Sequence, residues 1–293
     1  MLKYFDTPID EISEKILIEK GVRLFVKRED KNHHEVSGNK WWKLKYNLEE
    51  AKRLGHSTVL TFGGAFSNHI YATSAATCET GIKSIGVIRG ERTSPLNETL
   101  VFAEKKGMDL HFVSRDEYRR KTEPDFVEQL KKKLGDFYLI PEGGTNSLAV
   151  KGCAEFAREK LTEFDFQYLC LPVATGGTMA GIITGLAGRS TVIGFSVLKK
   201  GNFLEQEVRR LATQSAGRDF SNWRIETDYH FGGYAKKTRE LDIFMLRMAE
   251  EQNLPLDFVY SGKLVAGVFD LISKNHFPIG SRILMLHTGG LRN

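Results

Sequence analysis

The sequence contains few cysteines, no long apolar run and no large excess of charge of one sign. Its three cysteines, Cys78, Cys153 and Cys170, are odd in number and far apart, so they form neither a disulfide framework nor a CxxC metal pair. We interpret them as small buried hydrophobic residues of a protein in a reducing compartment.

No segment approaches the roughly 20 apolar residues that a membrane span needs, and no amino-terminal stretch has the order of a signal peptide. We therefore expect a cytoplasmic protein without a membrane partner. The net charge is only +5, and the basic residues are scattered apart from short runs such as Lys131–Lys133. Because a nucleic-acid site would cluster this charge on one element, we expect no nucleic-acid partner.

The length of 293 residues allows one large or two modest domains, and the composition, 41% hydrophobic and 27% charged, is that of an ordinary globular protein. Apolar, β-branched runs alternate with helical patterns, which predicts parallel sheets covered by helices on both faces. The predicted strands are 23–27, 58–61, 85–88, 110–113, 137–140 and 168–173.

The pattern restarts around Pro141–Asn146, where a second sheet begins. We predict an α/β fold of two open parallel-sheet domains: a larger one formed by residues 1–43 and 150–293, and a smaller inserted one formed by residues 44–149. Ligands of open α/β sheets bind at the carboxyl ends of the strands, so we expect a site between the two domains.

The loop Ala174-Thr175-Gly176-Gly177-Thr178 follows a buried strand and precedes a helix. Its free N–H groups and the positive end of the helix would converge on one point, which is suited to a phosphate. The spacing matches neither the Rossmann fingerprint nor the P-loop. A plain tight turn is the alternative.

Lys40 opens a predicted helix that ends near Gly55. Most lysines are simply solvated, but a cation is unfavourable at a helix start, which is a hint of function. A partly desolvated lysine is available as a nucleophile toward a carbonyl and as a base. Lys43 lies one turn further on the same face and could meet an anion.

Ser67 and Asn68 follow the break at Gly63-Gly64 and begin a helix that stops at Gly81. Turn and N-cap chemistry alone accounts for them. The alternative is that the N–H groups at this helix start bind a substrate carboxylate while the Asn68 amide binds a ligand oxygen.

Tyr234 and Tyr260 each stand next to a glycine break, so they are either packing residues or proton donors. His33-His34-Glu35 has no further ligand cluster nearby, and we predict no metal site there.

Taken in order along the chain, these segments resemble the fold-type II (tryptophan synthase β-like) pyridoxal-phosphate enzymes, in particular the family of 1-aminocyclopropane-1-carboxylate deaminase and D-cysteine desulfhydrase. The resemblance covers nearly the whole chain. The motifs that carry it are Lys27-Arg28-Glu29-Asp30, Gly38-Asn39-Lys40, Lys43-Leu44, Gly63-Gly64, Ser67-Asn68-His69, Pro141-Glu142-Gly143-Gly144-Thr145-Asn146, Thr175-Gly176-Gly177-Thr178, Tyr260-Ser261-Gly262-Lys263 and His287-Thr288-Gly289-Gly290.

This resemblance implies that the cofactor is pyridoxal 5′-phosphate and that the protein is a homodimer. It implies that Lys40 links covalently to the cofactor and that Asn68 binds the ring hydroxyl. The other implied roles are phosphate binding for residues 174–178 and Lys43, further cofactor contacts for Ser261 and Thr288, carboxylate binding for Ser67, Asn68 and His69, and places on the reacting side for Tyr234 and Tyr260.

Two positions bear on the reaction. Deaminases of the family resemble one another in having a glutamate after the motif tyrosine and a leucine within His-x-Gly-Gly, where this chain has Ser261 and Thr288. A hydroxyl beside the pyridine nitrogen tends to leave that nitrogen neutral and the ring a weaker electron sink, which suits loss of a good leaving group. We therefore expect a lyase that removes sulfide from D-cysteine and yields pyruvate and ammonia, with Lys40 as the base; a cyclopropane deaminase is the alternative.

The chain also departs from the family pattern. Two usual arginines are replaced by Trp42 and Tyr71, which either repack the protein or change its specificity. The chain stops at Asn293, where relatives usually carry a further segment. From these departures, a catalytically weak pyridoxal-phosphate-binding protein is a third possibility.

Overall fold

The structure is a computed structural model that describes residues 2–291; Asn293 lies outside the described residues. The chain forms two compact units. The first contains residues 2–4, His34–Val36 and Lys40–Ala149, and the second contains Phe5–His33, Ser37–Asn39 and residues 150–291.

The first unit is built on a wholly parallel sheet. Its strands lie in the order β5 (Met108–Val113), β4 (Lys83–Arg89), β3 (Thr58–Gly64) and β6 (Tyr138–Ile140). Its helices are α2 (Asn39–Arg53), α3 (Asn68–Thr80), α4 (Glu98–Lys105), α5 (Arg115–Arg119) and α6 (Pro124–Leu134).

Helices cover both faces of this sheet, as the sequence predicted. Val87 packs in a cluster with residues of α6 such as Phe126, whereas its neighbour Ile88 packs in another cluster with Leu100 of α4. Successive residues of a strand point to opposite faces, so each strand is buried on both sides.

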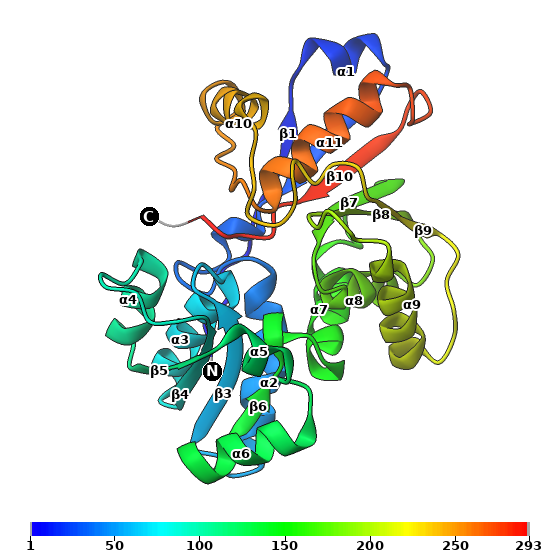
Figure 1. Ribbon diagram of the computed structural model, residues 1–293. Helices are drawn as coiled ribbons and strands as arrows, with labels where there is room; N and C mark the ends of the chain where they lie inside the picture. Colours follow the sequence, from blue (N-terminus) through cyan, green and yellow to red (C-terminus); the bar gives the residue numbers. More distant parts are fainter. Residues whose placement is uncertain (1, 292–293) are drawn as a thin grey trace. The chain divides into compact units, whose positions relative to one another are not determined.

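The second unit contains a mixed sheet. Its strands lie in the order β1 (Ile9–Ile12), β2 (Arg23–Lys27), β10 (Arg282–Leu286), β7 (Tyr168–Val173), β8 (Thr191–Ser196) and β9 (Trp223–Glu226). The edge strand β1 is antiparallel to β2, whereas the other neighbours are parallel. Four strands of this sheet, β1, β8, β9 and β10, were not among the predicted strands. The helices are α1 (Lys15–Glu19), α7 (Ser147–Lys160, which begins in the first unit), α8 (Gly177–Leu186), α9 (Phe203–Ala216), α10 (Arg239–Gln252) and α11 (Ser261–Ser273) (Figure 1).

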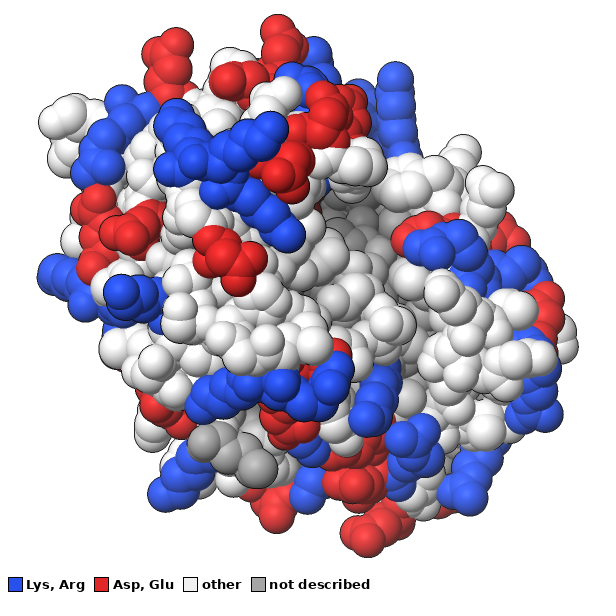
Figure 2. All heavy atoms as spheres, turned by 90° about the horizontal axis from the view of Figure 1, so that it is seen from below, with Lys and Arg blue, Asp and Glu red and all other residues white. Residues whose placement is uncertain are grey.

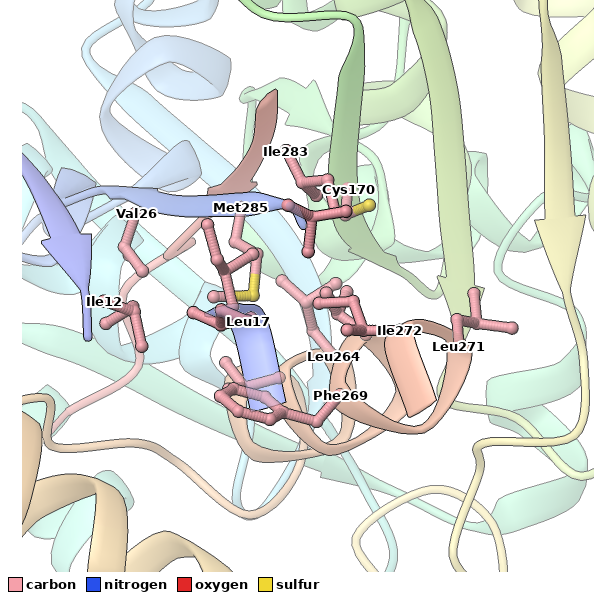
Figure 3. Packing of buried hydrophobic residues seen from close by; sticks show 14 of the residues in the cluster. Ile12, Leu17, Val26, Cys170, Leu264, Phe269, Leu271, Ile272, Ile283 and Met285 are labelled. Carbon is pink, nitrogen blue, oxygen red and sulfur yellow. The ribbon is translucent and has the colours of Figure 1, made fainter. Parts of the chain in front are cut away.

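The core of the second unit positions α11 against the sheet. Figure 3 shows Leu264, Phe269 and Ile272 of this helix facing Met285 of β10 and Cys170 of β7, all in one buried cluster. This packing fixes the position of α11 against the sheet, and with it the first residues of the helix, which belong to the Tyr260–Lys263 motif.

Two glycines allow α8 to pack closely against α7. A Cβ on Gly181 would lie 2.4 Å from the Cβ of Cys153, and one on Gly185 would lie 2.3 Å from the carbonyl oxygen of Ala154, so α7 and α8 approach too closely for larger side chains. Cys153 and Cys170 are buried as predicted, but Cys78 is exposed, which corrects the prediction for that residue. Cys78 lies in the last turn of α3, on the solvent side.

Lys and Arg side chains are interspersed with Asp and Glu on the face drawn in Figure 2. Within residues 2–291, no helix is long and apolar enough to cross a membrane.

Candidate functional site

The turn that precedes Lys40 is fixed by close backbone contacts. Gly38 has a left-handed φ of +69°, and a Cβ added there would lie 1.9 Å from the carbonyl oxygen of Thr288. The Gly38 N–H donates to the side chain of Asn32 at 2.8 Å, and the Asn32 amide donates back to the Gly38 carbonyl at 3.0 Å and to the buried carboxylate of Glu29 at 2.9 Å. These hydrogen bonds fix the backbone of the turn that immediately precedes Lys40.

Asn39 ties the same turn to the start of α8. Its amide donates to the hydroxyl of Thr178 at 2.8 Å. Gly176 adopts a left-handed conformation at the N-cap of α8 and, as a glycine, has no side chain that could cap the helix. A Cβ on Gly176 would lie 3.0 Å from a methyl carbon of Val208. The loop from Ala174 to Thr178 therefore lies at the positive end of a helix, where the first N–H groups have no partner within the helix itself.

In the first unit, Lys40 and Lys43 lie in the first turns of α2. Lys43 is almost fully buried, and its ammonium group donates to the hydroxyl of Thr145 at 2.9 Å. Asn146 and Asn47 exchange amide hydrogen bonds at 2.6 and 3.2 Å. The Pro141–Asn146 motif is therefore bound directly to the helix that carries both lysines.

Ser67 is the N-cap of α3, as predicted, and Gly81 ends this helix. The hydroxyl oxygen of Ser67 accepts from the N–H groups of His69 and Ile70 at 3.2 and 3.3 Å. These two N–H groups are thus already engaged by Ser67. Because the oxygen acts as the acceptor in both contacts, the hydroxyl proton of Ser67 is still available for a hydrogen bond to a ligand.

His69 has a fixed protonation state. Thr61 donates its single hydroxyl proton to the carbonyl of Ile140 at 2.8 Å, so the contact of 2.8 Å between Thr61 and His69 Nε2 requires the imidazole to donate. Burial, together with the charges of Lys40 and Lys43, lowers the pKa of His69 well below its ordinary value. The ring is therefore neutral, and its buried Nδ1 is an acceptor with no partner among the described residues.

Gly144 lies against this ring. It has a φ of +69°, and a Cβ there would lie 3.0 Å from Cε1 of His69. The second glycine of the Pro141–Asn146 motif thus leaves room for the imidazole.

Tyr234 and Tyr260, 26 residues apart in the sequence, meet in the second unit. The Tyr260 hydroxyl donates to that of Tyr234 at 3.3 Å, and the rings are edge to face with centroids 6.1 Å apart. Lys263 fixes the backbone next to Tyr234, because its buried ammonium group donates to the carbonyl of Gly233 at 2.7 Å. Burial lowers the pKa of Lys263 to about 8.

Ser261 and Thr288 are both buried residues of the second unit. Ser261 is the first residue of α11 and is hydrogen-bonded to Asp257, while Thr288 follows β10 and accepts from the N–H of Asn39 at 3.3 Å through its carbonyl. His287, next to Thr288, contacts the carbonyl of Pro255 at 2.9 Å. The segment before α11 and the end of β10 are therefore neighbours.

Trp42 and Tyr71, where the resemblance leads us to expect arginines, pack within the first unit. Trp42 is 3% exposed and lies edge to face with Tyr4 and Trp41, with centroids 5.0 and 4.8 Å away. Tyr71 stacks on Phe102 at 3.7 Å. Both contacts are those of packing residues.

The polar residues that support the site were not predicted from the sequence. They are Glu29, Asn32, Thr61, Thr145 and Asp257. Glu29 and Thr145 lie inside motifs that the resemblance used, but no role was assigned to them. The partners become recognisable only when the fold brings them beside Gly38, His69, Lys43 and Ser261.

Known proteins resemble this chain over most of its length. A model of the family described as pyridoxal-phosphate dependent enzymes matches residues 2–289. A mitochondrial bifunctional D-cysteine desulfhydrase/1-aminocyclopropane-1-carboxylate deaminase of Arabidopsis thaliana is 32% identical to this chain, over 92% of this chain and 73% of the relative. A D-cysteine desulfhydrase of Klebsiella pneumoniae is 29% identical, over 92% and 87% of the two chains. The crystal structure of a 1-aminocyclopropane-1-carboxylate deaminase homologue matches with a TM-score of 0.87 and 28% identity, covering 99% of this chain and 91% of that one.

Proposed function

Since this chain belongs to the family of pyridoxal-phosphate-dependent enzymes, with two parallel-sheet α/β units of fold type II, we propose that it is a D-cysteine desulfhydrase-like lyase. It would act on a small amino acid and release pyruvate, ammonia and hydrogen sulfide. The observation that carries this choice of reaction is the hydroxyl side chain at position 261, with threonine at 288, where the resemblance to the deaminases of the family would lead us to expect glutamate and leucine.

The residues present fit the cofactor. The start of α8, with its left-handed Gly176, would be the cradle for the phosphate, and Lys43 adds a positive charge in the first unit. Lys40 supplies the amine that an aldehyde requires, and Asn68 supplies an amide for the ring hydroxyl. The two hydroxyl residues Ser261 and Thr288 complete the set.

When bound, pyridoxal phosphate supplies an aldehyde that captures amines and a pyridine ring that withdraws electrons from Cα. Lys40 Nζ would hold the cofactor covalently, and its free amine would be the base that takes the Cα proton of the substrate. The Ser67 hydroxyl would donate a hydrogen bond to the substrate carboxylate. This agrees with its oxygen already accepting hydrogen bonds from two N–H groups. Tyr234 Oη receives the hydrogen bond of Tyr260, so its own proton is the one available to the departing sulfur.

His69 has a different place in this scheme than the sequence predicted. Its ring is buried and bound to Thr61, so we assign it to the support of the carboxylate site and not to direct contact with the carboxylate. A neutral ring beside two lysines avoids a third positive charge.

The cyclopropane deaminase remains the second candidate, because the Arabidopsis relative is named for both activities. We also propose that the protein is a cytoplasmic homodimer. Sedimentation of the purified protein tests the oligomer, and fractionation of the cells that produce it tests the compartment.

Purified protein loaded with cofactor and given D-cysteine, L-cysteine or 1-aminocyclopropane-1-carboxylate separately tests the function. Pyruvate and sulfide from D-cysteine are the expected products. Formation of 2-oxobutyrate from the cyclopropane alone would overturn the desulfhydrase in favour of the deaminase. Covalent cofactor binding without turnover of any of the three would identify the weak cofactor-binding protein instead.

A further inference from the structure

Asp257 organises the turn that carries Tyr260 and Ser261, although it lies outside the motif that begins at Tyr260. Its Oδ2 accepts from the backbone N–H groups of Val259 and Tyr260, each at 2.9 Å. Its Oδ1 accepts from the N–H of Ser261 at 2.8 Å and from the Ser261 hydroxyl at 2.7 Å. One carboxylate therefore satisfies the groups at the start of α11.

These contacts fix the direction of the Ser261 hydroxyl. The oxygen accepts from the backbone N–H of Asp257 at 2.8 Å. Its single proton has two acceptors in reach among the described residues, and both belong to Asp257: Oδ1 at 2.7 Å and the carbonyl oxygen at 3.4 Å. The shorter, charged acceptor is the stronger one. Ser261 thus has no proton left to donate and offers a ligand only a lone pair.

A ligand atom that meets this lone pair must be a hydrogen-bond donor. A neutral pyridine nitrogen is itself an acceptor, and two acceptors facing each other in a buried site are unfavourable. A protonated pyridine nitrogen is a donor and is favoured. Ser261 is 1% exposed, so water does not readily relieve the mismatch.

We propose that Asp257 is a positioning residue that takes the proton of Ser261 and thereby makes Ser261 accept a hydrogen bond from the protonated ring nitrogen of pyridoxal phosphate. The inference rests on the assignment of Ser261 to the cofactor in the proposed function. A serine hydroxyl by itself tends to leave the ring nitrogen neutral. Here the opposite is expected, because the carboxylate of Asp257 acts on the ring nitrogen through the Ser261 hydroxyl that lies between them. A protonated ring is a stronger electron sink, so with this proposal the choice of a desulfhydrase rests on the likeness of the Ser261 and Thr288 pair to that branch of the family and no longer on a weaker ring.

The test uses the whole protein loaded with pyridoxal phosphate labelled with ¹⁵N in the ring and measured by NMR without substrate. Protonated and neutral pyridine nitrogens differ widely in chemical shift. The expected result is a protonated nitrogen in the wild type and a shift toward the neutral signal in Asp257→Asn and Ser261→Ala. Asp242→Asn, which removes a carboxylate that forms an ion pair with Lys237 at 2.9 Å, is the matched control and should leave the signal unchanged.

A neutral ring nitrogen in the wild type would overturn the proposal whether or not the variants fold. A protonated signal that Ser261→Ala leaves unchanged would also overturn it, because the nitrogen would then have another partner. Failure of the proposed function is distinguishable, since it appears as absence of turnover on the three amino acids while the NMR result stands.

Discussion

Replacing Gly38 with alanine probes the turn that holds Lys40. A Cβ at this position would lie 1.9 Å from the carbonyl oxygen of Thr288 and 2.5 Å from the N–H nitrogen of Gly289, and both are backbone atoms that cannot rotate away. The left-handed φ of +69° adds strain for any residue with a side chain. Left-handed strain costs about 1 kcal/mol and overpacking about 1–3 kcal/mol, so we expect a loss of about 2–4 kcal/mol.

Gly217→Ala is the matched control. Gly217 lies in the same unit with a φ of +70°, but a Cβ there would meet no atom within 4 Å, so only about 1 kcal/mol of backbone strain should appear. Urea unfolding of the cofactor-free proteins measures both free energies. Mass spectrometry after borohydride reduction measures how much cofactor is linked to Lys40, and this amount should fall only for Gly38→Ala. Equal destabilisation by the two substitutions would refute the reasoning.

The amines and the imidazole of the site give three other predictions. Lys40→Ala should abolish covalent cofactor attachment, seen by mass, and lower kcat by about 10²–10⁴-fold; retained turnover would contradict the role of Lys40. Burial lowers the pKa of Lys263 from 10.5 to about 8, so between these pH values the unfolded state holds more protons and stability rises with pH. Lys263→Met should remove that rise in urea titrations at pH 8 and 10, and an unchanged slope would count against it. The lowered pKa of His69 means that the unfolded state takes a proton below pH 6.5 that the folded state refuses, so acid should destabilise the protein. NMR should show the neutral Nε2–H tautomer of His69 at pH 6, and a charged ring there would contradict the tautomer assignment.

The fold was largely predictable because parallel strands buried on both faces read as apolar runs. The runs at Thr58 and Ile85 lie within β3 and β4, and Tyr168–Val173 is β7 as predicted. The edge strand β1 escaped prediction for the opposite reason. It contains two acidic residues in four positions and faces a neighbour on one side only, so it lacks the apolar signature.

The site was predictable only where its chemistry is local. Ser67 caps the helix that it precedes, and this relation spans three residues of sequence. The partners that settle protonation and orientation lie further away: Thr61 fixes the tautomer of His69 through a contact with Ile140, 79 residues along the chain. No sequence pattern shows which acceptor will receive the single hydroxyl proton of a buried threonine. That information exists only in the folded arrangement.

The replacement of two family arginines by Trp42 and Tyr71 is best explained by packing. An arginine at position 42 would be buried among Tyr4 and Trp41, with the ammonium group of Lys45 already 6.0 Å from the Trp42 ring. Burying a second cation beside Lys45 would be costly, whereas the indole adds aromatic contacts. Tyr71 likewise fills its place by stacking on a neighbouring ring. Neither of these two positions supplies a positive charge, and in the function that we propose the substrate carboxylate depends on hydrogen-bond donors at the start of α3.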